Sequence, residues 1–159
     1  MSNSAEVFFI SLAASPAAMM FPVVCAGIKL YNLFMDIKQQ TRYWVVSGEE
    51  DFAAAQSLLD KGHLRHCLFF AHLAIEKMLK AHVVKTTLEI PPKIHDLIRL
   101  TEISQLHPTQ EQMSFLRRFG LYQLEGRYPD TAQAVIDAAT AKEKIESAKE
   151  IMKWLKAQL

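Results

Sequence analysis

The clearest structural signal in this chain is the stretch LRHCLFFAHLAIEKMLKAHVVK, residues 64–85. Its small and apolar residues recur every three or four positions, which predicts a helix with a broad buried stripe. The members of the stripe are Leu64, Cys67, Leu68, Ala71, Ala74, Ile75, Met78 and Ala81. Phe69, Phe70 and Leu73 lie outside the stripe, so the first half of the helix is apolar nearly all round. This pattern indicates a central helix or a dimer interface built on those three residues.

Apolar residues at helical spacing predict further helices on both sides of this one. We expect them at residues 39–61, 95–106, 109–124 and 140–159. Gly62 has the position of a residue that ends a helix, and Gly48 could let a neighbouring helix approach. The last two helices each begin with the spacing of a capping box, Thr109 with Gln112 and Thr140 with Glu143. The sequence therefore predicts an all-α protein, an antiparallel bundle of four or five helices.

Composition supports this fold class and excludes several others. The chain has 159 residues, of which 50% are hydrophobic and 22% charged, so disordered, collagen-like and disulfide-rich proteins are excluded. Only 5 Gly and 6 Pro interrupt it. The net charge of +1 gives no global reason to expect nucleic-acid binding. Cys25 and Cys67 form no metal-binding pair and suit a reducing compartment, so we expect a cytoplasmic protein.

Residues 1–34 form a hydrophobic N-terminal extension with no charge between Glu6 and Lys29. No basic residue precedes this uncharged stretch, which argues against a secretory signal peptide. A membrane segment is possible by length, although prolines interrupt it. The third interpretation is an upstream extension, with translation starting at Met35. We place the functional domain at residues 35–159 and expect no stable membrane role for it.

Basic residues concentrate in the middle of the chain. From Lys61 to Tyr128 there are ten Lys or Arg residues against six Asp or Glu residues. If the two helices that flank the Pro91–Pro92 loop pack antiparallel, Lys80 and Lys85 approach the start of the second of them, beside His95. Unpaired backbone N–H groups at a helix start favour an anion, so a phosphate pocket could form there. The alternative is that these are solvated charges at one end of the bundle.

The six histidines all lie between residues 63 and 107, but they do not predict a metal site. His63 with His66, and His72 with Glu76, share a helix face, yet no second helix offers the further ligands that zinc requires. Burial among apolar residues makes Cys67 an inert thiol. We therefore expect neither a metal nor a cofactor.

Five short motifs occur in an order that resembles the HEPN domain, a family named for nucleotide binding in higher eukaryotes and prokaryotes. They are W-x6-D at Trp44–Asp51, A-x2-L-L-x2-G at Ala55–Gly62, A-I-E-K-M-L-K-A at Ala74–Ala81, I-H-D-L at Ile94–Leu97 and R-Y-P-D at Arg127–Asp130. The resemblance covers residues 39–159. It implies an up-and-down bundle of four long helices plus a short one, often dimeric, and a partnership with small nucleotidyltransferase proteins.

The resemblance also implies which polar residues form a site. The residues expected to bind a nucleotide or phosphate are Lys77, Lys80, His95, Arg127 and Tyr128. Glu76 and Asp96 are expected to support them.

Many HEPN proteins are metal-independent ribonucleases with an R-x(4–6)-H motif late in the fold, and this chain departs from that pattern. No His follows Arg127, and the pair that has the spacing, Arg65 and His72, lies on the core helix of residues 64–85. We therefore expect a non-catalytic module that binds a nucleotide or RNA and acts with a nucleotidyltransferase, as in a toxin–antitoxin pair. One alternative is a ribonuclease toxin with an atypical Arg–His pair, for which His95, Arg65 and His72 are the candidates. The other is a structural homodimerisation module.

Overall fold

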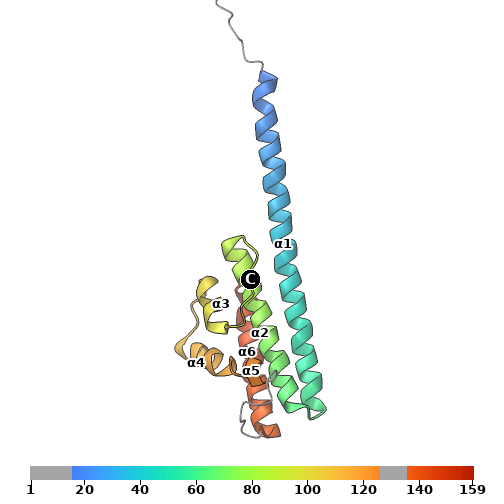
Figure 1. The fold of residues 1–159 in the computed structure, drawn as a ribbon, viewed down its shortest axis with the longest axis vertical. Coiled ribbons are helices and arrows are strands. Elements are labelled where there is room, and N and C mark those ends of the chain that lie inside the picture. Colours follow the sequence, from blue (N-terminus) through green and yellow to red (C-terminus); the bar gives the residue numbers. More distant parts are fainter. Residues whose placement is uncertain (1–15, 126–135) are drawn as a thin grey trace, which may run out of the picture. The chain divides into compact units, whose positions relative to one another are not determined.

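The structure, a computed structural model, describes the backbone of residues 16–125 and 136–159, and the side chains of residues 36–123 and 136–159 (Figure 1). Its contacts divide the chain into two units, Met1–Met35 and Asp36–Leu159. In the first unit, residues 16–35 are helical. The second unit holds the helical bundle and all the side chains discussed below. Among the residues that the structure describes, no helix has both the length and the hydrophobicity needed to cross a membrane.

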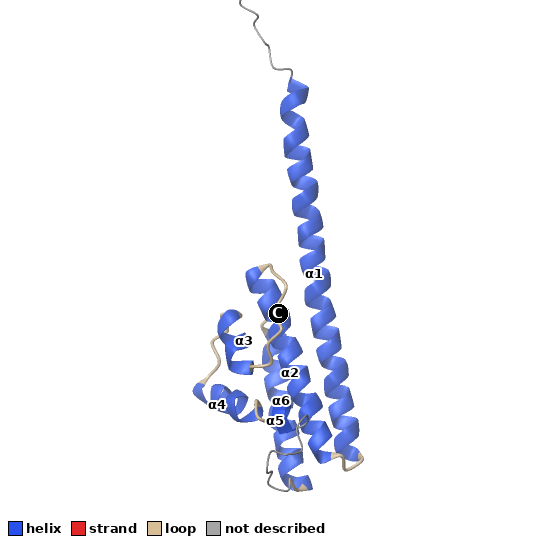
Figure 2. Cartoon of the chain, viewed as in Figure 1, coloured by secondary structure: helices blue, strands red, loops and turns tan. Residues whose placement is uncertain are grey.

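The described residues form helices joined by turns and loops and contain no strand (Figure 2), which confirms the prediction of an all-α bundle. The helices are α1 (Pro16–Asp60), α2 (Leu64–Thr87), α3 (Leu97–Ile103), α4 (Gln110–Phe119), α5 (Tyr122–Glu125) and α6 (Ala138–Ala157). The helix expected at residues 109–124 is divided, because α4 ends at Phe119 and α5 begins at Tyr122. The turn expected at residues 126–130 lies outside the described residues.

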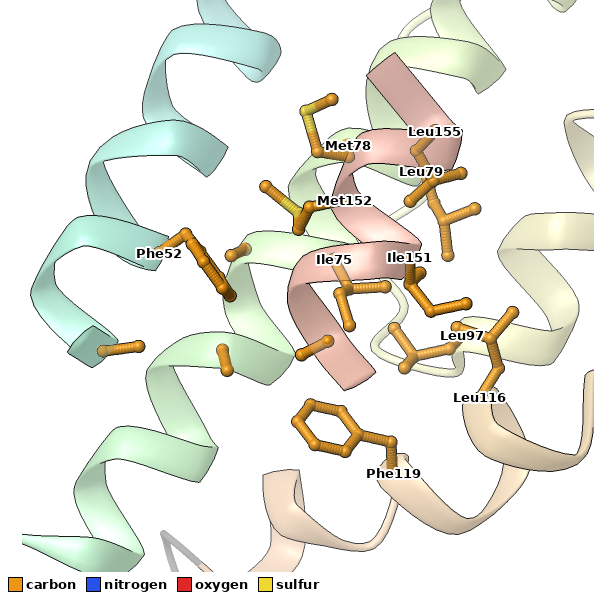
Figure 3. Packing of buried hydrophobic residues seen from close by; sticks show 14 of the residues in the cluster. Phe52, Ile75, Met78, Leu79, Leu97, Leu116, Phe119, Ile151, Met152 and Leu155 are labelled. Carbon is orange, nitrogen blue, oxygen red and sulfur yellow. The ribbon is translucent and has the colours of Figure 1, made fainter. Parts of the chain in front are cut away.

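Helix α2 is the centre of the bundle, and it packs against α3, α5 and α6. Of the predicted apolar stripe, seven residues are fully buried and Leu64 is partly buried. Figure 3 shows Ile75 and Leu79 of α2 among Leu97 of α3, Phe119 of α4 and Leu155 of α6. Burying a leucine, isoleucine or phenylalanine side chain stabilises a fold by about 1.5–3 kcal/mol, so the apolar residues packed around α2 contribute much of the bundle's stability.

Two glycines place α2 beside the Asp36–Asp60 part of α1. Gly62 has φ +76°, a left-handed conformation that favours glycine, and it lies in the short turn between the two helices. A Cβ atom at Gly48 would lie 3.1 Å from the backbone oxygen of Ala74. The two helix backbones therefore approach closely at Gly48, as the sequence suggested.

Of the two capping boxes predicted from the sequence, one is present and the other is not. Thr109 and Gln112 form the predicted capping box of α4. The box predicted for Thr140 and Glu143 is wrong, because α6 begins earlier and Asp137 is its cap. The Asp137 carboxylate accepts the backbone N–H of Thr140 at 2.7 Å, so Thr140 already lies within the first turn.

Candidate functional site

A buried carboxylate, Glu76 of α2, is the centre of the polar residues predicted from the sequence. Only 3% of Glu76 is exposed. Lys80 Nζ donates a hydrogen bond to its Oε1 atom at 2.7 Å, and the Nδ1 atom of His95 lies 3.0 Å from its Oε2 atom. On the other side, His72 Nε2 is 3.6 Å from Oε2. We call these four side chains the Glu76 cluster.

The helical repeat explains why three members of the cluster come from one helix. His72, Glu76 and Lys80 are four residues apart, so they follow one another along the same face of α2. His95 comes from the segment between α2 and α3, which returns past this face. The structure therefore brings Lys80 and His95 together, as the charge pattern suggested.

Burial and hydrogen bonding act in opposite directions on the Glu76 carboxyl. Burial raises its pKa, whereas the nearby His72 ring, the hydrogen bonds with Lys80 and His95, and the charge of Lys80 lower the pKa, and the result is about 2. Glu76 is thus ionised at neutral pH. Because an ionised carboxylate can only accept hydrogen bonds, Nδ1 of His95 is the donor, and Nε2 is the ring nitrogen left for a ligand.

Lys80 serves the interior of the protein more than its surface. Only 7% of the residue is exposed, and its ammonium group lies 5.3 Å from the centre of the Trp44 ring, which favours a cation. Its charge neutralises Glu76, since an unpaired carboxylate buried to this extent would be strongly destabilising. Lys80 therefore holds the cluster together and offers little surface to a phosphate.

The other lysines of the expected pocket point elsewhere. Lys77 Nζ lies 2.6 Å from the Asp51 carboxylate and donates a hydrogen bond to Ser47 Oγ at 2.8 Å, so it ties α2 to α1. Lys85 donates to the backbone oxygens of Gln158 and Leu159 instead of approaching His95. The prediction for Lys85 is wrong because five residues along a helix turn its side chain away from the face of Lys80.

Two of the amides expected to be unpaired at the start of the helix after Pro92 already have a side-chain acceptor. The Asp96 carboxylate accepts the N–H groups of Ile98 at 2.9 Å and Arg99 at 3.1 Å. Asp96 is therefore the N-cap of α3, and it directly follows His95 in the chain.

His95 opens instead onto a cleft of about 610 Å³ between the start of α3 and α4. About 40% of the His95 side chain is exposed. Besides His95, the lining residues are Asp96, Leu97, Ile98, Leu116, Arg117, Gly120 and Gln123. Arg117 is exposed and pairs with no acidic side chain in the described part of the chain. The cleft thus joins an oriented imidazole to an arginine, two groups that suit a phosphate.

The remaining predicted site residues divide into three groups. His72 is fully buried, so the Arg65–His72 pair cannot act on an external nucleic acid. Phe69, Phe70 and Leu73 are half-buried, with the two rings edge to face at 5.8 Å. Arg127 and Tyr128 lie outside the described residues.

Sequence reasoning missed the contribution of α4. Arg117 and Arg118 are not among the predicted site residues, and nothing in the sequence links them to His95. Gly120 was the one indication of the cleft in the sequence. It is four residues after Leu116, on the same helical face, and a glycine there leaves room for an open cleft. Among the described side chains, no group of three or more histidine, cysteine or acidic residues could hold a metal ion.

Comparison with known proteins supports the helical architecture. The family model described as HEPN domain matches residues 41–158. The crystal structure of TT1696 from Thermus thermophilus superposes with a TM-score of 0.65 at 20% identity, covering 76% of this chain and 98% of that one. The structure of ST0689, described as an archaeal HEPN homologue, gives a TM-score of 0.61 at 20% identity, covering 74% and 96%. No curated protein matches the chain.

The Glu76 cluster predicts a specific loss of stability in acid. Because the pKa of Glu76 lies below its unfolded value of 4.5, its contribution is present above pH 4.5 and is lost as the pH falls toward 2, by about 3 kcal/mol in the free energy of unfolding. Urea unfolding at a series of pH values should show a smaller loss for the double variant Glu76→Gln, Lys80→Met.

The matched control is Glu150→Gln with Lys153→Met, which removes an exposed ion pair of 2.7 Å on α6. This control should keep the pH dependence of the wild type. Equal pH dependence in the wild type and the Glu76–Lys80 double variant would contradict the assignment.

Proposed function

The chain belongs to the HEPN domain family, and we propose that it binds a phosphate group of a nucleotide or polynucleotide in the cleft lined by His95 and Arg117. The observation that carries this proposal is the hydrogen bond between His95 and the buried Glu76 carboxylate. It fixes one ring nitrogen and leaves the other for a ligand in a cleft that also contains an arginine.

This proposal assigns different roles to the residues that the sequence placed together. His95 and Arg117 contact the phosphate, and Glu76 positions His95. Lys80 neutralises Glu76, and Lys77 holds α1 against α2. An arginine suits the contact because its guanidinium donates two parallel hydrogen bonds to one phosphate and keeps its charge at every physiological pH.

Arg117→Ala is expected to weaken the binding of a short fluorescein-labelled single-stranded RNA about tenfold, because one charged phosphate contact is lost. Fluorescence anisotropy at several salt concentrations should also show a smaller salt dependence for this variant. Arg99→Ala is the control, since Arg99 is exposed, pairs with Glu102 and lies outside the cleft lining. If the two variants bind RNA equally, the cleft is not the site.

The same hydrogen bond supports a second candidate, the metal-independent cleavage of RNA. A carboxylate that holds one imidazole nitrogen leaves the other in the form that can accept a proton, as a general base requires. Arg117 would stabilise the negative charge that develops on the scissile phosphate. This pair replaces the buried Arg65–His72 pair as the atypical Arg–His arrangement.

If the protein is a ribonuclease, it should cut single-stranded RNA in the presence of EDTA, and His95→Asn should slow cleavage at least a hundredfold. His66→Asn is the matched control, since His66 is an exposed histidine of the same region of the sequence. Gel analysis of labelled RNA decides the matter. An inactive wild type, or equal cleavage by His95→Asn, rejects catalysis at this site.

We further propose that the module acts in the cytoplasm as a homodimer and together with a small nucleotidyltransferase. The half-buried side chains of Phe69, Phe70 and Leu73 support a dimer interface on α2, because they expose apolar area beside the fully buried stripe. The nucleotidyltransferase partner rests on the family resemblance.

Light scattering should give the mass of a dimer for the purified chain and of a monomer for Leu73→Asp. Leu88→Asp, which places the same charge at an exposed apolar residue near the other end of α2, should leave the mass unchanged.

Co-expression with a small nucleotidyltransferase from the same genome should yield one complex. A monomeric wild type, or two proteins that elute separately, would contradict the corresponding proposal.

A further inference from the structure

A second pocket lies next to the cleft, on the neighbouring side of α4. It has a volume of about 200 Å³ and is lined by Phe115, Arg118, Phe119, Leu121, Tyr122 and Lys144. Pockets for whole small-molecule ligands are usually larger, about 300–1,000 Å³. This one therefore suits a single ring rather than a complete cofactor. We call it the aromatic pocket.

The floor of the aromatic pocket is a set of three packed rings. The rings of Phe115 and Phe119 are stacked at 4.8 Å, and the ring of Tyr122 meets Phe119 edge to face at 5.2 Å. Phe119 is buried in the core, whereas Phe115 and Tyr122 are half-buried and remain partly open to a ligand. Because the core holds Phe119, the stack offers a rigid aromatic surface at little cost in conformational entropy.

The rim of this pocket is cationic. Arg118 is exposed, and within the described ranges it forms no ion pair. Lys144 of α6 lies 3.5 Å from the carboxylate of the adjacent Glu143. Leu121 adds an exposed apolar side chain, 57% accessible. The pocket thus combines aromatic rings, an apolar side chain and two cations. This combination suits a ligand with a planar ring and a negatively charged group attached to it.

The two pockets share α4, and adjacent residues of that helix line them. Phe115 lines the aromatic pocket and Leu116 the cleft; Arg118 lines the aromatic pocket and Arg117 the cleft. Successive residues of a helix are rotated by about 100° about its axis, so Arg117 faces the cleft and Arg118 faces the aromatic pocket. A chain of nucleotides whose phosphate lies in the cleft can therefore place a neighbouring base in the aromatic pocket.

We infer that the aromatic pocket is a nucleobase subsite, which makes single-stranded nucleic acid the ligand of this surface. The inference rests on the proposed phosphate-binding role of the cleft. A base stacks on Phe115 and Tyr122, and Arg118 and Lys144 hold the phosphates on either side of it. Stacking needs an unpaired base and accepts any base, so the site prefers single strands without reading their sequence.

The experiment compares two probes of equal charge: a short mixed-sequence single-stranded RNA and an abasic sugar-phosphate strand of the same length, both labelled with fluorescein. The wild type should bind the RNA about tenfold more tightly than the abasic strand. Phe115→Leu keeps an apolar side chain but removes the ring, so it should weaken RNA binding about tenfold and leave abasic binding unchanged. Tyr43→Leu, which removes a ring from an exposed position outside the pocket lining, is the control.

Arg118→Ala gives a second test that does not alter the ring stack. It should weaken the binding of both strands, whereas a purely structural role at the end of α4 would lower stability without changing either affinity. Equal wild-type affinity for the two strands overturns the nucleobase subsite while the phosphate cleft stands. Binding of neither strand overturns the cleft and the subsite together.

Discussion

The buried charge of Glu76 is the constraint on which the polar half of this bundle depends. A carboxylate that is 3% exposed must be neutralised and hydrogen-bonded inside the protein. Lys80 supplies the opposite charge from one turn along α2, and His95 supplies a second donor from the segment before α3. One ionised group therefore fixes both the local electrostatics and the path of the chain between α2 and α3.

The bundle could be predicted from the sequence because apolar spacing follows the helical repeat directly. The stripe of residues 64–85 is buried, and the Thr109–Gln112 box begins α4 as expected. The predicted start of α6 was wrong because two residues can cap this helix. Asp137 and Thr140 both offer a cap to α6, and the earlier one is used because its carboxylate accepts the N–H of the later one.

The candidate site could be predicted only in part, because a sequence shows which residues are charged but not where their charge is used. Lys80 looks like a phosphate ligand until its neighbour Glu76 is seen to be buried. Arg117 carries no motif, and its place opposite the start of α3 depends on how α3 and α4 pack. His95 was identified both from the sequence and from the structure. In the sequence it follows the Pro91–Pro92 loop, and in the structure it donates a hydrogen bond to the Glu76 carboxylate.

The use of Lys80 inside the protein has a consequence for how the surface can attract an anion. A lysine bound to a buried carboxylate contributes little net field, since the two charges cancel at a distance. The attraction must then come from cations without a nearby acid, and among the described residues that line the cleft and the aromatic pocket these are Arg117 and Arg118 of α4. Helix α2 thus builds the frame that orients His95, while α4 provides the positive charge. The two tasks lie on different helices because a cation that neutralises a buried acid cannot also serve a ligand.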